Sequence, residues 1–110
     1  MKQGEIWLVD LNPVKVSEQA GVRPVVIVSG NLANTHLKTV ICCPIISKVK
    51  NYKGNLVLEP GKQNGFKAVS EILTHQIRSI SKDRLMKHIG AISAKELAQI
   101  KQSFDEIWRY

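Results

Sequence analysis

Four consecutive β-branched residues, Val25–Val26–Ile27–Val28, constrain the fold of this chain more than any other feature. Such side chains favour extended backbone. A run in which apolar and polar residues do not alternate predicts a strand that is buried on both faces. We therefore expect a central strand over residues 24–29. Pro24 fixes its own φ at the start of this strand and biases Arg23 toward extended geometry.

Short apolar segments separated by Gly, Pro and Asn predict further strands around this one. These expected strands are residues 5–11, 39–46, 55–59, 68–73 and 75–80. Short helical turns are expected at residues 31–38 and 81–85. Ser93 and Glu96 make a capping-box pattern, and the apolar residues at 97, 100, 104, 107 and 108 then share one helix face. The pattern predicts a mainly β fold with a C-terminal α-helix, a small curled β-barrel on which the helix packs.

The length of 110 residues suits one compact domain with a single core, so we expect one domain over residues 1–110. An apolar fraction of 44% is typical of a globular chain and argues against disorder. No apolar run is long enough to span a bilayer, and the N-terminus lacks the apolar region of a signal peptide. We therefore expect a cytoplasmic location and no membrane partner.

The two cysteines, Cys42 and Cys43, are adjacent and lie in an apolar run. Neighbouring cysteines rarely reach the Cα spacing and direction that a disulfide needs. We expect small buried side chains, and a redox-active pair is the alternative. A metal site would need more ligands than the chain groups together, so no metal and no cofactor are expected.

The formal net charge is +7, and the middle third of the chain carries most of the excess. Residues 38–67 hold six lysines against one glutamate, which gives this segment a net charge of +5. A basic set of loops favours a polyanionic partner, most simply nucleic acid. A lysine-rich solubilising surface is the alternative. In this segment the lysines of residues 48–53 are candidates for contacts with phosphate groups.

The loop that leads into the central strand places a carboxylate and a guanidinium five positions apart, next to a glycine. Its sequence is Ser17-Glu18-Gln19-Ala20-Gly21-Val22-Arg23-Pro24. A polar loop joined directly to a buried strand is a common way for a small scaffold to position reactive groups. The guanidinium is able to grip two phosphate oxygens at once.

Two segments of the sequence, GEIWLVDLNP at 4–13 and SEQAGVRPVVIV at 17–28, closely resemble the MazF/PemK family of toxin–antitoxin ribonucleases. The similarity continues through residues 43–45 and 75–80 and covers essentially the whole chain. The resemblance implies an SH3-like small β-barrel, of the type also found in the gyrase poison CcdB, and a two-fold homodimer. It also implies sequence-selective, metal-independent cleavage of single-stranded RNA, usually mRNA. A cognate antitoxin is implied as well, with a disordered segment that blocks the RNA groove.

Metal-free RNA cleavage uses the neighbouring 2′-hydroxyl as nucleophile, and it needs a base, an acid and a cation for the phosphorane charge. By resemblance Arg23 is the catalytic arginine, and a structural salt bridge with Glu18 is the alternative. Glu18 is a candidate base or a residue that orients Arg23, unless it is an ordinary loop carboxylate. The family commonly has Thr where this chain has Ile46. Ser47, one residue on, is then the candidate hydroxyl, provided that a bulge or loop start turns it inward.

The remaining candidate RNA-binding residues come from the matched segments and the basic loop. They are Lys15, Ser17, Gln19, Lys48, Lys50, Lys53, His75, Gln76 and Arg78. His75 suits proton transfer near neutral pH, but a hydrogen-bonded strand histidine is the alternative. Two other functions compete: a catalytically weak RNA-binding relative, and a gyrase-targeting toxin of the same fold. The gyrase poison ends in Trp-Gly-Ile, whereas this chain ends in Trp108-Arg109-Tyr110.

Overall fold

The computed structural model describes residues 1–11 and 21–109. The strands in this part of the chain are β1 (Glu5–Asp10), β2 (Val22–Ile27), β3 (Thr39–Ile46), β4 (Leu56–Leu58), β5 (Ser70–Ile72), β6 (Arg78–Ser81) and β7 (Leu85–Ala91). The helices are α1 (Asn31–His36) and α2 (Ala94–Arg109), with 3₁₀ turns η1 (Thr74–Gln76) and η2 (Lys82–Arg84). The expected mainly β fold with one long C-terminal helix is confirmed.

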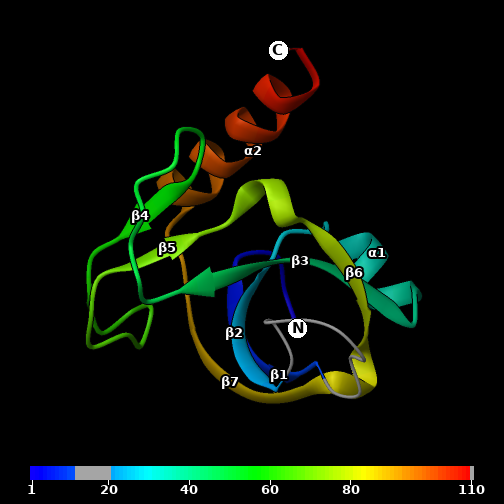
Figure 1. Ribbon diagram of the computed structural model, residues 1–110. Helices are drawn as coiled ribbons and strands as arrows, with labels where there is room; N and C mark the ends of the chain where they lie inside the picture. Colours follow the sequence, from blue (N-terminus) through cyan, green and yellow to red (C-terminus); the bar gives the residue numbers. More distant parts are fainter. Residues whose placement is uncertain (12–20, 110) are drawn as a thin grey trace.

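The strands pair in the order β4-β5-β3-β2-β1-β7, and β6 pairs with the first half of β3. Every pairing is antiparallel. The sheet curls strongly, while β4 and β5 lie to one side of it, next to α2 (Figure 1). No pairing among the described residues joins β4 to β7, so the sheet stays open where a closed barrel is expected. At that end β4 and β5 have three residues each, a span of roughly 10 Å.

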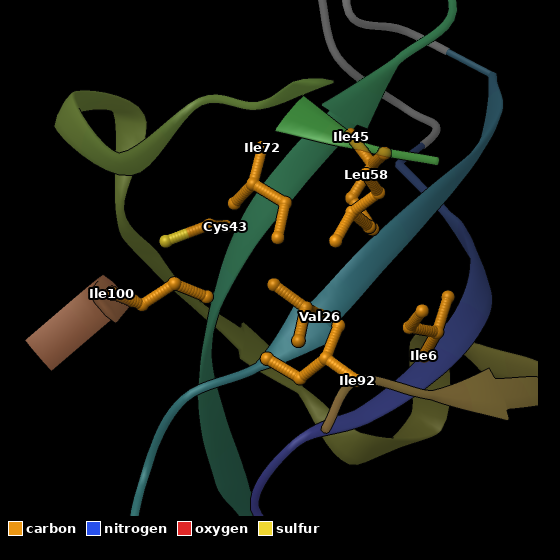
Figure 2. Close-up of a cluster of buried hydrophobic side chains, with 8 residues drawn as sticks. All are labelled: Ile6, Val26, Cys43, Ile45, Leu58, Ile72, Ile92 and Ile100. Atoms are coloured by element: carbon orange, nitrogen blue, oxygen red, sulfur yellow. The ribbon is translucent and has the colours of Figure 1, made fainter. Parts of the chain in front are cut away.

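The β-branched run forms the buried centre of the sheet, as predicted, although β2 starts and ends two residues earlier than expected. Val25, Val26 and Ile27 are each 0% exposed, and β2 lies between β1 and β3. Because its side chains alternate, β2 contributes to a core cluster on each face of the sheet. One cluster is Ile6, Val26, Cys43, Ile45, Leu58, Ile72, Ile92 and Ile100 (Figure 2). The other is Val9, Leu11, Val25, Ile27, Val40, Cys42 and Ile80.

Cys42 and Cys43 are both buried and free, and each belongs to a different core cluster. Successive strand residues point to opposite faces, so the two thiols face away from each other. Burial raises the pKa of each thiol to about 12, so neither is a reactive thiolate near neutral pH. The interpretation as small buried side chains is confirmed, and the redox pair is wrong.

The expected strand over residues 75–80 is partly wrong, because the chain makes the turn η1 before β6 begins at Arg78. Thr74, the first residue of this turn, is 1% exposed. Its hydroxyl donates to the carbonyl oxygen of Gly54 at 2.9 Å, which ties the turn to a loop twenty residues earlier. This long-range contact replaces the strand geometry that the local sequence favours.

Strand β7 is absent from the sequence-based expectations. It pairs with β1, but the register shifts twice, between Ile6 and Trp7 and between Leu8 and Val9. Bulges of this kind interrupt the alternation of buried and exposed side chains by which a strand is recognised. The missing alternation explains why the sequence does not predict this strand.

Helix α2 begins at the predicted capping box. The backbone N–H of Ser93 donates to Glu96 Oε1 at 2.8 Å, and that of Glu96 donates to Ser93 Oγ at 3.1 Å. Ile100 is buried in the first core cluster, while Trp108 near the end of the helix is 81% exposed. Among residues 1–11 and 21–109, no helix is both long and apolar enough to pass through a bilayer.

Candidate active site

Arg23 is placed by the register of the central strands. In β2 it lies opposite Val9 of β1, and two residues later Val25 lies opposite Pro44 of β3. The same antiparallel register, continued by two residues, brings Arg23 beside Ile46 at the end of β3. Because these strands are anchored by fully buried side chains, the position of the arginine backbone is set by the core of the protein.

Two adjoining hollows share Arg23, Ile46 and Ser47. The larger, here called the basic hollow, has a volume of about 470 Å³ and is lined by Arg23, Ile46, Ser47, Lys48, Lys50, Tyr52, Leu73 and Gln76. The smaller, of about 260 Å³, extends toward residues 66–70. The described lining of the basic hollow carries three cationic side chains and no carboxylate. Its electrostatics therefore suit an anion such as a phosphodiester.

Ser47 is the first residue after β3, at a bend that continues through Lys48. Its side chain is exposed and lines both hollows, and the half-buried Ile46 lines both as well. The loop start that an inward hydroxyl requires is therefore present at Ser47. Ser47, from the loop after β3, and Arg23, from β2, border the same space.

The structure brings five of the sequence-predicted site residues together. Arg23, Ser47, Lys48, Lys50 and Gln76 all line the basic hollow. They come from β2, from the loop after β3 and from η1, three segments that are distant in sequence. The combination supplies one guanidinium, one hydroxyl, two ammonium groups and one amide around a single space.

Other predicted residues lie elsewhere. Lys53 lines a separate hollow beside α2, and His75 lines an apolar hollow with Ile77, Phe104, Ile107 and Trp108. Arg78 is an exposed residue of β6, opposite Cys42 of β3. Lys15, Ser17, Glu18 and Gln19 lie outside the described residues.

A buried carboxylate, which the sequence reasoning missed, holds the loop that follows β3. Glu71 of β5 is 0% exposed, and its Oε1 accepts hydrogen bonds from the backbone N–H groups of Lys50 at 2.6 Å and Asn51 at 2.9 Å. Its Oε2 accepts from the N–H of Tyr52 at 3.2 Å and from Nδ2 of Asn55 at 2.8 Å. Burial by itself raises the pKa of this carboxyl, but the four hydrogen bonds outweigh burial and the pKa is lowered.

Two residues carried signals in the sequence that point to the site. Tyr52 is an aromatic residue within a basic loop, a combination typical of proteins that stack RNA bases. Glu71 is the one charged residue of a predicted strand, residues 68–73, whose other residues are apolar apart from Ser70. A charge in such a place needs partners, although the sequence does not name them.

Within the described residues, no three His, Cys, Asp or Glu side chains are arranged to hold a metal ion.

Comparison with known proteins agrees with the fold and identifies the family. A model of the PemK-like, MazF-like toxins of type II toxin–antitoxin systems matches residues 2–108. Endoribonuclease MazF of Staphylococcus saprophyticus is 35% identical over 107 residues, which cover 96% of this chain and 88% of that protein. Endoribonuclease MazF9 of Mycobacterium tuberculosis is 37% identical over 108 residues, which cover 94% and 92%.

A solved structure of an endoribonuclease in complex with its cognate antitoxin, from a mycobacterial species, has a similar fold. The TM-score is 0.77 at 17% identity, and the alignment covers 99% of this chain and 93% of that one. At this identity the likeness supports the fold alone, whereas the family model and the two relatives establish common descent along nearly the whole sequence. The chain therefore belongs to the family of PemK-like, MazF-like toxins of type II toxin–antitoxin systems.

Proposed function

We propose that the protein is the toxin of a type II toxin–antitoxin system and a sequence-selective, metal-independent endoribonuclease that cleaves single-stranded mRNA. The observation that carries this proposal is the basic hollow, where Arg23, Ser47 and two loop lysines border one space. Cationic groups and a hydroxyl around one space are donors that can bind the oxygens of a phosphodiester. Two relatives that are named endoribonucleases, at 35% and 37% identity, support the activity.

The proposed reaction uses the RNA's own 2′-hydroxyl. A base removes its proton, the 2′-oxygen bonds to the adjacent phosphorus, and the bond from phosphorus to the 5′-oxygen breaks. The 5′-oxygen takes up a proton, so the products carry a 2′,3′-cyclic phosphate and a 5′-hydroxyl. Arg23 has the role of stabilising the charge on the non-bridging oxygens through two parallel N–H donors. Glu18, outside the described residues, keeps its proposed role as the base or as the residue that orients Arg23.

Ser47 is proposed to act in catalysis together with Arg23, and the other lining residues are proposed to bind RNA. Ser47 donates a hydrogen bond to a non-bridging oxygen, and Lys48 and Lys50 bind flanking phosphates. Tyr52 offers an aromatic face to an unstacked base, and Gln76 offers an amide to a base edge. These two contacts would give the sequence selectivity.

The remaining proposed RNA contacts are not among the described residues that line the basic hollow. They are Lys53, His75 and Arg78 in the described part of the chain, and Lys15, Ser17 and Gln19 outside it. Because the three described residues line other surfaces, RNA would meet them only at nucleotides beyond the cleaved bond.

We propose a single toxin domain over residues 1–110 that acts in the cytoplasm, where mRNA is found. Two protein partners are proposed for this domain. One is a cognate antitoxin, as in the mycobacterial complex of similar fold. The other is a second copy of the chain, because Ile107 and Trp108 expose apolar surface beside a hollow of about 310 Å³. Light scattering at roughly tens of micromolar protein should show a dimer, and a monomer would contradict this proposal.

The proposed activity is tested by incubating the purified protein with a long single-stranded RNA, in EDTA and in Mg²⁺. We expect discrete fragments in both buffers, with 2′,3′-cyclic phosphate and 5′-hydroxyl ends. Loss of cleavage in EDTA with recovery in Mg²⁺ would contradict the metal-independent reaction. Tight RNA binding without cleavage would favour the catalytically weak RNA-binding relative instead.

A further inference from the structure

Glu71 is not one of the residues that line the basic hollow, yet the loop that lines it is bonded to this carboxylate. We infer that Glu71 is a positioning residue for RNA binding: its carboxylate fills an anion-binding nest formed by the backbone of residues 50–52, and so holds Lys50 and Tyr52 at the hollow. Because the role concerns RNA, it rests on the function proposed above.

The nest is visible in the backbone. Three consecutive N–H groups, those of Lys50, Asn51 and Tyr52, converge on the two oxygens of one carboxylate. Asn51 has a φ of 54°, in the left-handed region that asparagine tolerates better than most residues. Successive N–H groups in a right-handed then left-handed turn make a concavity that binds anions. Here the anion comes from β5 of the same chain, so the loop is fixed to the sheet.

A second tie joins the far end of the loop and the turn η1 to the same carboxylate. Asn55 donates its Nδ2 to Glu71, and its Oδ1 accepts the backbone N–H of Thr74 at 3.1 Å. Thr74 is two residues before Gln76, which lines the hollow from η1. One buried charge therefore organises both the loop wall and the turn wall of the basic hollow.

The sign of the expected effect separates this role from simple electrostatics. Glu71 lies opposite Ile46 in the register of β3 and β5, so a negative charge lies one strand away from the hollow. If only its charge mattered, removing it would strengthen the binding of a polyanion. If it positions the loop, removing it weakens binding, because Lys50 and Tyr52 lose their fixed places.

The test compares Glu71→Gln with Glu59→Gln in the full chain. Both substitutions remove one negative charge, but Glu59 is exposed directly after β4 and lines a different hollow. In Glu71→Gln the new amide places an NH₂ donor against the N–H donors of the loop, so the nest loses acceptors. The probe is an RNA with a 2′-deoxy substitution at the cleaved nucleotide, at one salt concentration.

We expect the Kd of Glu71→Gln for this RNA to rise about tenfold, the scale of losing one charge-assisted hydrogen bond or more. Its KM for cleavable RNA should rise by a similar factor with a smaller change in kcat, because the positions of Arg23 and Ser47 depend on β2 and β3 and not on Glu71. Glu59→Gln should bind as tightly as the wild type or slightly more tightly. Binding by Glu71→Gln that equals or exceeds that of Glu59→Gln would overturn the inference.

Amide hydrogen exchange measured without RNA tests the anchor independently of activity. In the wild type, the amides of residues 50–52 should be protected, and in Glu71→Gln this protection should be lost while the core amides of β2 stay protected. If the wild-type amides exchange as fast as those of an unbonded loop, the inference fails even where the variant does not fold. Protected amides in a protein that neither binds nor cleaves RNA would instead overturn the proposed function, together with the RNA-positioning role.

Discussion

The basic hollow has two sides that are built in different ways. On the strand side, Arg23 and Ser47 are placed by the register of β2 and β3, whose buried residues form the centre of the core. On the loop side, Lys50 and Tyr52 are placed by hydrogen bonds to one buried carboxylate. Apolar packing fixes the first side, and a polar network fixes the second.

The two sides of the hollow require different precision in the placement of their side chains. Charge stabilisation in a transition state loses strength when the donor is misplaced by about 1 Å, so the guanidinium that we propose to be catalytic is better placed on a rigid strand. Phosphate and base contacts beyond the cleaved bond tolerate more movement and are carried by loops. Substitutions on the strand side should therefore lower kcat, whereas those on the loop side should mainly weaken binding.

Arg23→Ala should have the largest effect. The loss of a guanidinium that stabilises the phosphorane should lower the cleavage rate by roughly 10²-fold or more. Arg23→Lys should recover little, because an ammonium group cannot form two parallel hydrogen bonds. Single-turnover cleavage measures the effect. Arg109→Ala, which removes an exposed arginine paired with Asp105 on α2, is the matched control. A normal cleavage rate in Arg23→Ala would show that this residue has no role in catalysis.

The two variants Ser47→Ala and Ile46→Thr test which position on the strand side supplies the hydroxyl. If Ser47 supplies the hydroxyl, Ser47→Ala should slow cleavage by about one to two decades, the scale of a hydrogen bond to a charged group, and Ile46→Thr should add little. Rates of both variants on one RNA decide the matter. Faster cleavage by Ile46→Thr together with an unchanged Ser47→Ala would show that the hydroxyl is missing in the natural chain.

Lys50→Ala and Lys53→Ala compare two lysines of one loop, of which Lys50 alone lines the basic hollow. Lys50→Ala should weaken RNA binding a few-fold and reduce the salt slope by about 0.7, the value for one contact with a single-strand phosphate. The backbone N–H of residue 50 still reaches Glu71, so the loop stays in place. Titrations at several salt concentrations measure the slope. An equal effect of Lys53→Ala would contradict the conclusion that only Lys50 of these two lysines contacts RNA in the basic hollow.

The smallest effect concerns stability in acid. Because the folded pKa of Glu71 is lowered from its ordinary value of 4.5, the carboxyl in the unfolded chain takes up its proton at a higher pH than in the folded chain. The stability that the carboxylate gives is complete above that value and is lost as the pH falls below it. The Tm difference between wild type and Glu71→Gln should therefore shrink as the pH falls below the ordinary value of 4.5 and through the lower pKa of the folded protein. Glu5 also has a lowered pKa but is common to both proteins. A constant difference would argue against the carboxylate network.

The sequence predicts the strand side of the site well and the loop side poorly. The β-branched run places β2, and with it Arg23, because burial on both faces needs only the residues of that run. The capping box likewise places the start of α2 from two residues. These features depend on residues that are close together in the sequence, so they can be predicted from it.

The anchor of the loop is different, because three of the four donors to Glu71 are backbone N–H groups about twenty residues earlier in the chain. Every residue except proline has such a group, so the sequence holds no trace of the pairing. The bulges of β7 are hidden for a related reason, since they arise from its pairing with β1.

We propose that the two sides of the basic hollow bind one RNA strand together. An NMR titration of labelled protein with the 2′-deoxy-substituted RNA tests it most directly. We expect the signals of Arg23, Ser47 and Lys50 to shift with one common Kd, while that of Gln99, which lines a different hollow, stays in place. Shifts confined to one side of the hollow, or different Kd values for the two sides, would contradict the claim.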